Sequence, residues 1–453
     1  MQDAQGSLIH EATSLFRLVE SIDRFVGEHG NLYAYTSATR RFFRLIHEHS
    51  EGAKKEISAI IQQAAVTPGP LASRYTGQLL IMKGRWKTLH TYITPATDAH
   101  TLKIPVPLIQ MATEDLHLIP GMQDAAIVAL LTPELMYYQN NPRAHLSPDL
   151  LFVEIPYSQG PSFFTNLSIY HEIGHWVFDR LPDSGDHAAA FANLNEATEQ
   201  AFKAKLSPAL KSASTTTWAK GVLAAWTQEI FCDLFAVRHL GPAFSFALID
   251  VLSLIGLMRK DTESTFDNLH PAPALRFREQ FERLNKDGWW QIVKDLPSEH
   301  VSLITRLAAT SGSGYSFEFQ DNLIPAFIEA FSAIPPLIHQ LVLDLTPHCA
   351  EAAEDFRQHR SNIETCLLHG VVPSHLLTEN SGSPAPVSMI NAAYCFYLTR
   401  LPDLMNKLEG QRPTEPDHRR VWIDKLEAWT MKGVEDSQLL TGVEIGGSQR
   451  ASA

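Results

Sequence analysis

The chain has 453 residues, of which 45% are hydrophobic and 19% are charged, a composition typical of a globular protein with a large core. The length allows two or three domains. The formal net charge of −13 argues against a nucleic-acid backbone as the main partner, because basic side chains normally supply that affinity.

The N-terminal stretch "MQDAQGSLIHEATSLFRLVESIDRFV" is typical of an amphipathic helix. It has no basic first part, no uninterrupted apolar run and no small-residue cleavage site, so we expect no signal peptide. The four cysteines, Cys232, Cys349, Cys366 and Cys395, are widely spaced and form no CxxC pair. This favours buried thiols in a reducing compartment, and we predict a cytoplasmic location.

Helical periodicity continues through residues 1–97, which we interpret as a helical N-terminal domain. Three β-type runs follow at 101–109, 125–132 and 149–156, each marked by proline or turn residues at its ends. From Pro161 the pattern is helical again almost to the end of the chain. The sequence therefore predicts a predominantly α-helical α+β fold with a small β-sheet.

The most apolar segment is "PAFSFALIDVLSLIGLM", residues 242–258. It is short for a membrane span and carries Asp250 near its middle, so a buried core helix is the better interpretation. We expect no membrane span.

The stretch "SIYHEIGHWVF", residues 168–178, carries two histidines four apart with a glutamate between them. On a helix His171 and His175 project to nearly the same side, one turn apart, so both can reach one zinc ion. Glu172 lies off that line but close enough to act on a water beside the ion. Two histidines on an ordinary apolar helix would give the same pattern, so further ligands are needed.

A second helical segment, residues 226–242, places Glu229 and Asp233 four apart among apolar residues. Burying unpaired carboxylates is costly, and a zinc ion ligated by Glu229 would provide a partner. Asp233 could accept the N–H of a ligating histidine and fix its tautomer. Alternatively both acids lie on a solvated stripe or pair with Arg238. His187 is a second candidate for the third ligand.

In a third segment, "NLHPAPALRFREQ" at 268–280, His270-Pro271 opens a predicted helix whose early turn carries Arg276. Either side chain could stabilise developing oxyanion charge over the metal. The alternative is a plain helix start with Arg276 in a surface ion pair.

HEIGH, then EIFCD, then HPAPALR resembles the gluzincin zinc metallopeptidases, and more narrowly the CAAX-prenyl endopeptidases and related heat-shock membrane proteases. The resemblance covers residues 160 to 280. It implies zinc ligation by His171, His175 and Glu229, a general base in Glu172, a supporting Asp233, and His270 and Arg276 as catalytic accessories. It also implies a zincin-like core, which we place at 98–285 with active-site helices beside the small sheet. The helical pattern that follows predicts a helical C-terminal domain at 286–440, and the composition of the last residues predicts a disordered tail at 441–453. Without transmembrane helices, a prenylated or intramembrane substrate is not expected.

These features predict a soluble, cytoplasmic zinc metallopeptidase with one catalytic Zn²⁺ and a peptide or protein substrate. The run "AAIVALLT" could be an edge strand that pairs with an extended peptide, or simply a buried strand. Three alternatives remain at this point: a non-catalytic metal-bearing protein that binds a regulatory partner through its C-terminal helical domain, a helical protein without a metal, and a zinc hydrolase acting on a non-peptide substrate.

Overall fold

The computed structural model describes residues 2–29, 36–64, 66, 72–101, 104–133, 138–140, 147–156, 162–185, 187–210, 212–259, 263–267, 269–310, 315–317, 323–376, 384–409 and 416–451. The chain divides into two compact units. Unit 1 contains residues 1–106 and 124–160, and unit 2 contains residues 107–123 and 161–453.

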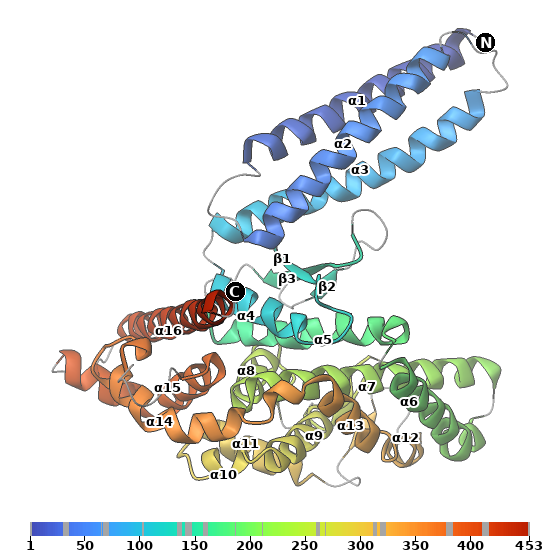
Figure 1. Cartoon of the computed structure of the whole chain (residues 1–453). Helices are drawn as coiled ribbons and strands as arrows, with labels where there is room; N and C mark the ends of the chain where they lie inside the picture. Colours follow the sequence, from blue (N-terminus) through green and yellow to red (C-terminus); the bar gives the residue numbers. More distant parts are fainter. Residues whose placement is uncertain are drawn as a thin grey trace. The chain divides into compact units, whose positions relative to one another are not determined.

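Unit 1 consists of three long helices and a small sheet. The helices are α1 (Gln2–His29), α2 (Ser37–Ala64) and α3 (Ala72–Thr101), and the strands are β1 (Ala126–Thr132), β2 (Tyr138–Asn140) and β3 (Leu150–Pro156). The three helices lie side by side (Figure 1). The strand order is β1-β3-β2, with β1 parallel and β2 antiparallel to β3.

The core of unit 1 lies between the helices and the sheet. Apolar residues recur at helical spacing along α2, where Phe42, Ile46 and Ile57 are fully buried. Every residue of β1 is buried, because α2 and α3 pack against this strand. The ring of Phe152 on β3 meets that of Phe42 edge-on, with centroids 5.1 Å apart.

The structure confirms two of the three predicted β-type runs, since β1 and β3 fall within 125–132 and 149–156. The prediction for 101–109 is wrong, because helix α4 (Val106–His117) begins there. Pro105 and Pro107 lack N–H donors and suit the start of a helix better than a sheet. Buried residues of α4 then follow a helical spacing that the short run could not reveal. β1 is an edge strand of its sheet, but all its residues are buried. This agrees with the alternative interpretation of "AAIVALLT" as a buried strand.

Unit 2 is almost entirely helical. Its further helices and strands are α5 (Ile169–Arg180), α6 (Ala188–Ala201), α7 (Ala213–Leu240), α8 (Pro242–Leu254), β4 (Thr265–Phe266), α9 (Pro273–Lys286), α10 (Trp290–Val293), α11 (Glu299–Ala308), β5 (Ser316–Phe317), α12 (Ile324–Phe331), α13 (Pro335–Leu345), α14 (Ala352–Leu368), α15 (Pro386–Glu409) and α16 (Pro416–Ala451). Strands β4 and β5 form a parallel pair.

Helix α7 is central to unit 2, since α5, α8, α9 and α13 all pack against it (Figure 1). Nearly every residue from Trp226 to Leu240 is buried. Helix α8, which contains the most apolar stretch of the sequence, is buried from Pro242 to Ile249, as predicted for a core helix. Helices α14, α15 and α16 pack in sequence against one another.

The observed fold is predominantly α-helical with small β-sheets, which confirms the predicted class. The division into units differs from the predicted boundaries at 97/98 and 285/286, because the strands belong to unit 1 and the C-terminal helices share unit 2 with α5 and α7. Helix α16 continues to Ala451, through most of the predicted disordered tail. Once a helix has formed, each further residue adds one hydrogen bond, so propagation is easier than the glycine-rich composition suggests.

One described stretch, Ile324–Leu345, is long and apolar enough by length and composition to cross a membrane. Half of its most apolar window is buried. In the structure this stretch comprises α12 and α13, and Pro335 begins the second helix. Because α13 packs against α7, the apolar surface of this stretch contributes to the core of unit 2.

Candidate metal centre

The HEIGH stretch lies on helix α5, as the sequence predicts. His171 is buried, and His175, one turn later, is partly exposed. Ile173 and Val177 are buried on the same helix and anchor it in the core. The two imidazoles therefore start from a rigid element, which a site for metal chemistry requires.

At Gly174, helix α5 lies very close to helix α7. A Cβ atom at this position would lie 2.8 Å from Cα and 3.1 Å from Cβ of Cys232. The glycine lets two helix backbones come together, and this approach brings the side chains of both helices to one place.

Helix α7 begins at a capping serine, Ser212, whose hydroxyl accepts the backbone N–H of Thr215 at 3.2 Å. Glu229 and Asp233 lie four residues apart on its buried half, with relative exposures of 7% and 0%. Both acids are therefore buried, and a solvated stripe is ruled out. Arg238, the alternative partner, pairs with Asp287 at 3.1 Å.

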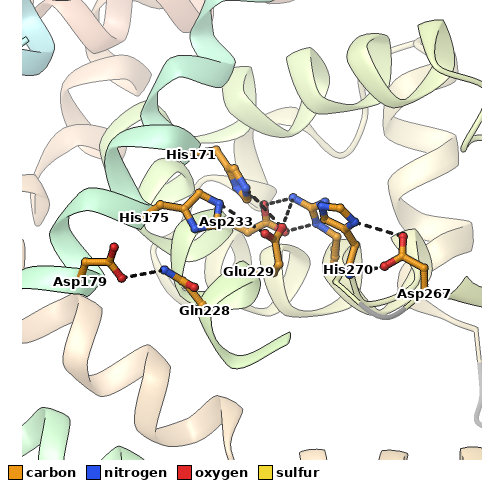
Figure 2. Close-up of polar contacts among 9 residues, drawn as sticks. His171, His175, Asp179, Gln228, Glu229, Asp233, Asp267 and His270 are labelled. Carbon is orange, nitrogen blue, oxygen red and sulfur yellow. Dashed lines mark hydrogen bonds and ion pairs between the residues drawn. The ribbon is translucent and has the colours of Figure 1, made fainter. Parts of the chain in front are cut away.

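Figure 2 shows the side chains of His171, His175 and Glu229 pointing toward one another. Nε2 of His171 lies 3.3 Å from Oε2 of Glu229, and Nε2 of His175 lies 3.3 Å from Oε1. Two donors about 2.1 Å from one tetrahedral zinc ion are separated by about 3.4 Å. Oε2 of Glu229 is buried and accepts no hydrogen bond. The donor atoms and their spacing therefore fit a zinc ion.

Asp233 connects the first histidine to a buried arginine. Its Oδ1 lies 2.9 Å from Nδ1 of His171. Arg276 donates to the same carboxylate twice, from Nε to Oδ2 and from Nη2 to Oδ1, both at 2.7 Å. The Nη2 atom of Arg276 also lies 3.6 Å from Oε2 of Glu229. This is the supporting position that the sequence predicts for Asp233.

The charges of these residues favour a cation between the helices. Burial by itself would lower the pKa of His171, but the carboxylates of Glu229 and Asp233 outweigh it and raise this pKa to about 10. Burial by itself would raise the pKa of Glu229, but His171, His175 and Arg276 hold this pKa well below its usual value. Two buried carboxylates thus stabilise positive charge at this point.

The third predicted segment contributes Arg276 to this cluster, although not in the predicted way. We expected His270-Pro271 to open the helix, but α9 begins at Pro273, with Ala272 as its N-cap. The guanidinium of Arg276 is buried and bonded to Asp233. Together with its 3.6 Å approach to Oε2 of Glu229, this bonding makes Arg276 a cation shared by both carboxylates.

His270 lies in the loop before α9 and is held by a residue that sequence reasoning missed, Asp267 (Figure 2). The Asp267 carboxylate accepts the backbone N–H groups of Leu269 and His270 at 2.6 and 2.5 Å, and its Oδ2 lies 3.1 Å from Nδ1 of His270. A carboxylate two or three residues before backbone donors is a common turn arrangement, so the spacing in "DNLH" was a usable signal. The imidazole of His270 is partly exposed and its ring is oriented by Asp267.

Cys232 also lies close to the two histidines, although the sequence did not single it out as a ligand. One donor atom from each of His171, His175 and Cys232 lies within 4.8 Å of the other two. Burial raises the pKa of the Cys232 thiol well above its usual value, and neighbouring Glu229 and Glu172 add to this effect. Glu229 is the better third ligand, because its low pKa keeps its carboxylate ionised and its oxygens lie 3.3 Å from Nε2 of His171 and of His175.

His187, the alternative third ligand, is buried at the start of α6. In the part of the chain that the structure describes, His187 makes no hydrogen bond or ion pair with His171 or His175. Glu172 lies between the two histidines in the first turn of α5 and is partly exposed.

No family model, curated protein or solved structure matches this chain. The chemistry of the site must therefore be argued from its geometry. Two imidazoles and a carboxylate converge, a second carboxylate and an arginine support them, and a further glutamate, Glu172, is partly exposed on the helix that carries the histidines. Such an arrangement can hold one zinc ion and carry a proton beside it.

In the part of the chain that the structure describes, a cavity of about 250 Å³ also borders α7. It is lined by Lys220, Leu223 and Thr227 of α7 and by Phe178 of α5. These α7 residues follow the spacing of a single helix face. Glu229, two residues after Thr227, points to a direction rotated by roughly 200°. The cavity therefore lies on a different face of α7 from the candidate metal centre.

Proposed function

We propose that this protein is a zinc-dependent metallopeptidase that hydrolyses peptide bonds with Glu172 as general base. One observation carries the proposal: Nε2 atoms of His171 and His175 each lie 3.3 Å from the buried Glu229 carboxylate, one oxygen of which accepts no hydrogen bond. Three donors at this spacing, two imidazoles and one carboxylate, are the ligand set of catalytic zinc sites that keep a fourth position for substrate or water.

When bound there, zinc would supply a water of lowered pKa and polarise the scissile carbonyl. The chain's own residues have separate tasks. Glu172, which is partly exposed and follows His171 on the same helix, takes a proton from the attacking water and returns it to the leaving amine. Asp233 keeps the proton of His171 on Nδ1, so that Nε2 offers its lone pair.

The remaining accessory roles follow from hydrogen bonding. Arg276 is a positioning residue, because its guanidinium is occupied by Asp233. His270 is the better candidate for stabilising oxyanion charge, since its ring is partly exposed and Asp267 orients it through Nδ1. The substrate class is a peptide or protein. We place the protein in the cytoplasm, in keeping with four free, buried cysteines.

The test of this function compares Glu172→Gln with wild type, both loaded with zinc, on a mixture of unstructured peptides analysed by mass spectrometry. Removing the base should reduce the cleavage rate about 10²- to 10⁴-fold while the zinc content stays at the wild-type value. Glu196→Gln, at an exposed glutamate of α6, is the matched control and should cleave at the wild-type rate.

Two outcomes would contradict the proposal. Unchanged cleavage by Glu172→Gln would remove this residue from the mechanism. Zinc-loaded wild type that cleaves no peptide in the mixture would favour the alternative of a metal-bearing regulatory or binding protein.

A further inference from the structure

A second cluster of metal-binding side chains lies at the far end of α7. His239, in the last turn of that helix, meets His348 and Cys349 of the short turn Pro347–Cys349 between α13 and α14. One donor atom from each of the three lies within 4.8 Å of the other two. His239 and Glu229 are ten residues apart on one helix, a rise of about 15 Å, so this cluster is separate from the candidate metal centre.

The hydrogen bonding of His239 fixes which of its nitrogens can bind a metal. Nδ1 lies 2.9 Å from the backbone carbonyl of Phe235. A carbonyl can only accept, so Nδ1 carries the proton and Nε2 carries a lone pair. Ligating histidines in metalloproteins commonly use a backbone carbonyl in this way.

That lone pair has no partner in the protein. Nε2 of His239 is buried without a hydrogen bond, in a side chain that is only 3% exposed. An unsatisfied buried acceptor costs free energy, and most buried polar atoms in proteins are paired.

The surroundings supply two further donors and an entry path. The Cys349 side chain is nearly buried, whereas His348 is exposed, with its ring centroid 5.5 Å from that of His239. The Asp115 carboxylate acts electrostatically on His348 and would favour a cation. Arg238 acts against a cation, and Asp287, which lies 3.1 Å from Arg238 and 2.6 Å from Arg283, offsets part of its charge.

We propose that His239, His348 and Cys349 form a second zinc site, which joins the C-terminal end of α7 to the connection between α13 and α14. Two imidazoles and a thiolate suit zinc among the divalent ions common in cells, and the exposed side leaves the fourth position to water. Binding releases the proton of the Cys349 thiol to solvent, because the thiolate is the ligand.

Among the described residues, Glu279, Glu282 and His339 form another group that could hold a metal ion, but this group is a weaker candidate for a metal site. Its carboxylates are already neutralised, since Arg278 donates to Glu279 and Lys286 pairs with Glu282. The His239 cluster has no such cation bonded to its donor atoms among the described contacts.

The first test uses the unmodified full chain and the rate at which iodoacetamide alkylates each cysteine, with and without zinc. Cys366 is the internal control, because it is as buried as Cys349 but lies outside both sites. Zinc should slow alkylation of Cys349 at least tenfold and leave Cys366 unchanged. Equal rates for Cys349 with and without zinc would overturn the proposal.

The second test uses cobalt(II) as a spectroscopic substitute for zinc in the Cys232→Ser protein, so that the other site contributes no thiolate. The near-ultraviolet thiolate-to-cobalt band should appear, vanish when Cys349→Ser is added, and persist when Cys366→Ser is added instead. A band that survives Cys349→Ser, or no band in the Cys232→Ser parent, would contradict the assignment. The proposal does not depend on the proposed peptidase function, and His171→Ala should leave the zinc protection of Cys349 intact.

Discussion

Nδ1 of His171 lies 2.9 Å from Oδ1 of Asp233, across the interface between α5 and α7. A carboxylate can only accept from this imidazole, so the pair fixes the tautomer of His171 and directs Nε2 toward Glu229. Because Arg276 donates twice to the same carboxylate, three elements distant in sequence determine the state of one nitrogen atom. The predictions below test this arrangement and the packing that produces it.

Arg276→Met should destabilise the protein strongly, because it leaves the fully buried Asp233 without its cation. Breaking a buried ion pair on one side costs about 3–5 kcal/mol. Urea unfolding of the full chain, followed by tryptophan fluorescence, measures the change in the free energy of unfolding.

The matched control for this change is Arg357→Met. Arg357 pairs with Glu354 on the exposed surface of α14, where such pairs contribute about 0–1 kcal/mol. If both variants unfold at the same urea concentration, the buried pair does not stabilise the fold as described. Adding Asp233→Asn to Arg276→Met should recover part of the lost stability, because the uncompensated charge is removed.

Gly174→Ala should push α5 away from α7, since the new Cβ would lie 2.8 Å from the backbone of Cys232. We expect a loss of about 1–3 kcal/mol and weaker zinc binding, because the ligands on the two helices separate. Thermal unfolding and a competition assay with a zinc-binding dye measure the two effects.

Gly221→Ala, on α7, controls for the intrinsic preference of alanine for helices. No atom lies within 4 Å of a Cβ at Gly221, so this change should stabilise the protein by about 0.5–1 kcal/mol. Zinc binding by Gly174→Ala with wild-type affinity would show that the close approach of the helices does not set the ligand geometry.

His100, on α3 in unit 1, should make that unit sensitive to acid. Burial lowers the pKa of His100 to about 4, and its Nε2 lies 2.9 Å from the hydroxyl of Thr39. Because the folded-state pKa is below the unfolded value of 6.5, the neutral form contributes stability above pH 6.5. The stabilising contribution of neutral His100 is lost as the pH falls from 6.5 toward 4. Because the His100 side chain is partly exposed, the loss in the free energy of unfolding is no more than about 2 kcal/mol.

Hydrogen–deuterium exchange of α2 and α3 amides at pH 7 and pH 5, corrected for intrinsic rates, measures this effect. His100→Gln should reduce the loss of protection between the two pH values, whereas His90→Gln, at an exposed position of α3, should not. An identical pH response in His100→Gln and wild type would refute the assignment.

The sequence predicts local features of this protein well. Spacing of four residues on apolar segments placed His171 with His175 and Glu229 with Asp233 on helices, and the structure has both pairs on α5 and α7. Helix periodicity also predicts the fold class. The error at 101–109 shows the limit of this reasoning, because a short apolar run with prolines fits the start of a helix as well as a strand.

Contacts between residues that are far apart in the sequence were harder to predict from the sequence. The role of Gly174 depends on the Cα of Cys232, 58 residues away, which composition cannot reveal. In the same way, His239 approaches Cys349 only because α13 packs against α7 and the following turn comes back to the end of that helix. Arg276 was placed in the correct neighbourhood, but its bonding to Asp233 could be known only from the packing of α9 against α7.

The most direct measurement is the zinc content of purified wild type, His171→Ala, Glu229→Gln and Cys232→Ser by mass spectrometry, each with the second site disabled by Cys349→Ser. We predict about one zinc per chain in the parent and in Cys232→Ser, and loss of zinc in His171→Ala and Glu229→Gln. Zinc retained by Glu229→Gln but lost from Cys232→Ser would make the cysteine the third ligand. A parent protein that binds no zinc would contradict the account of α5 and α7 as a metal centre.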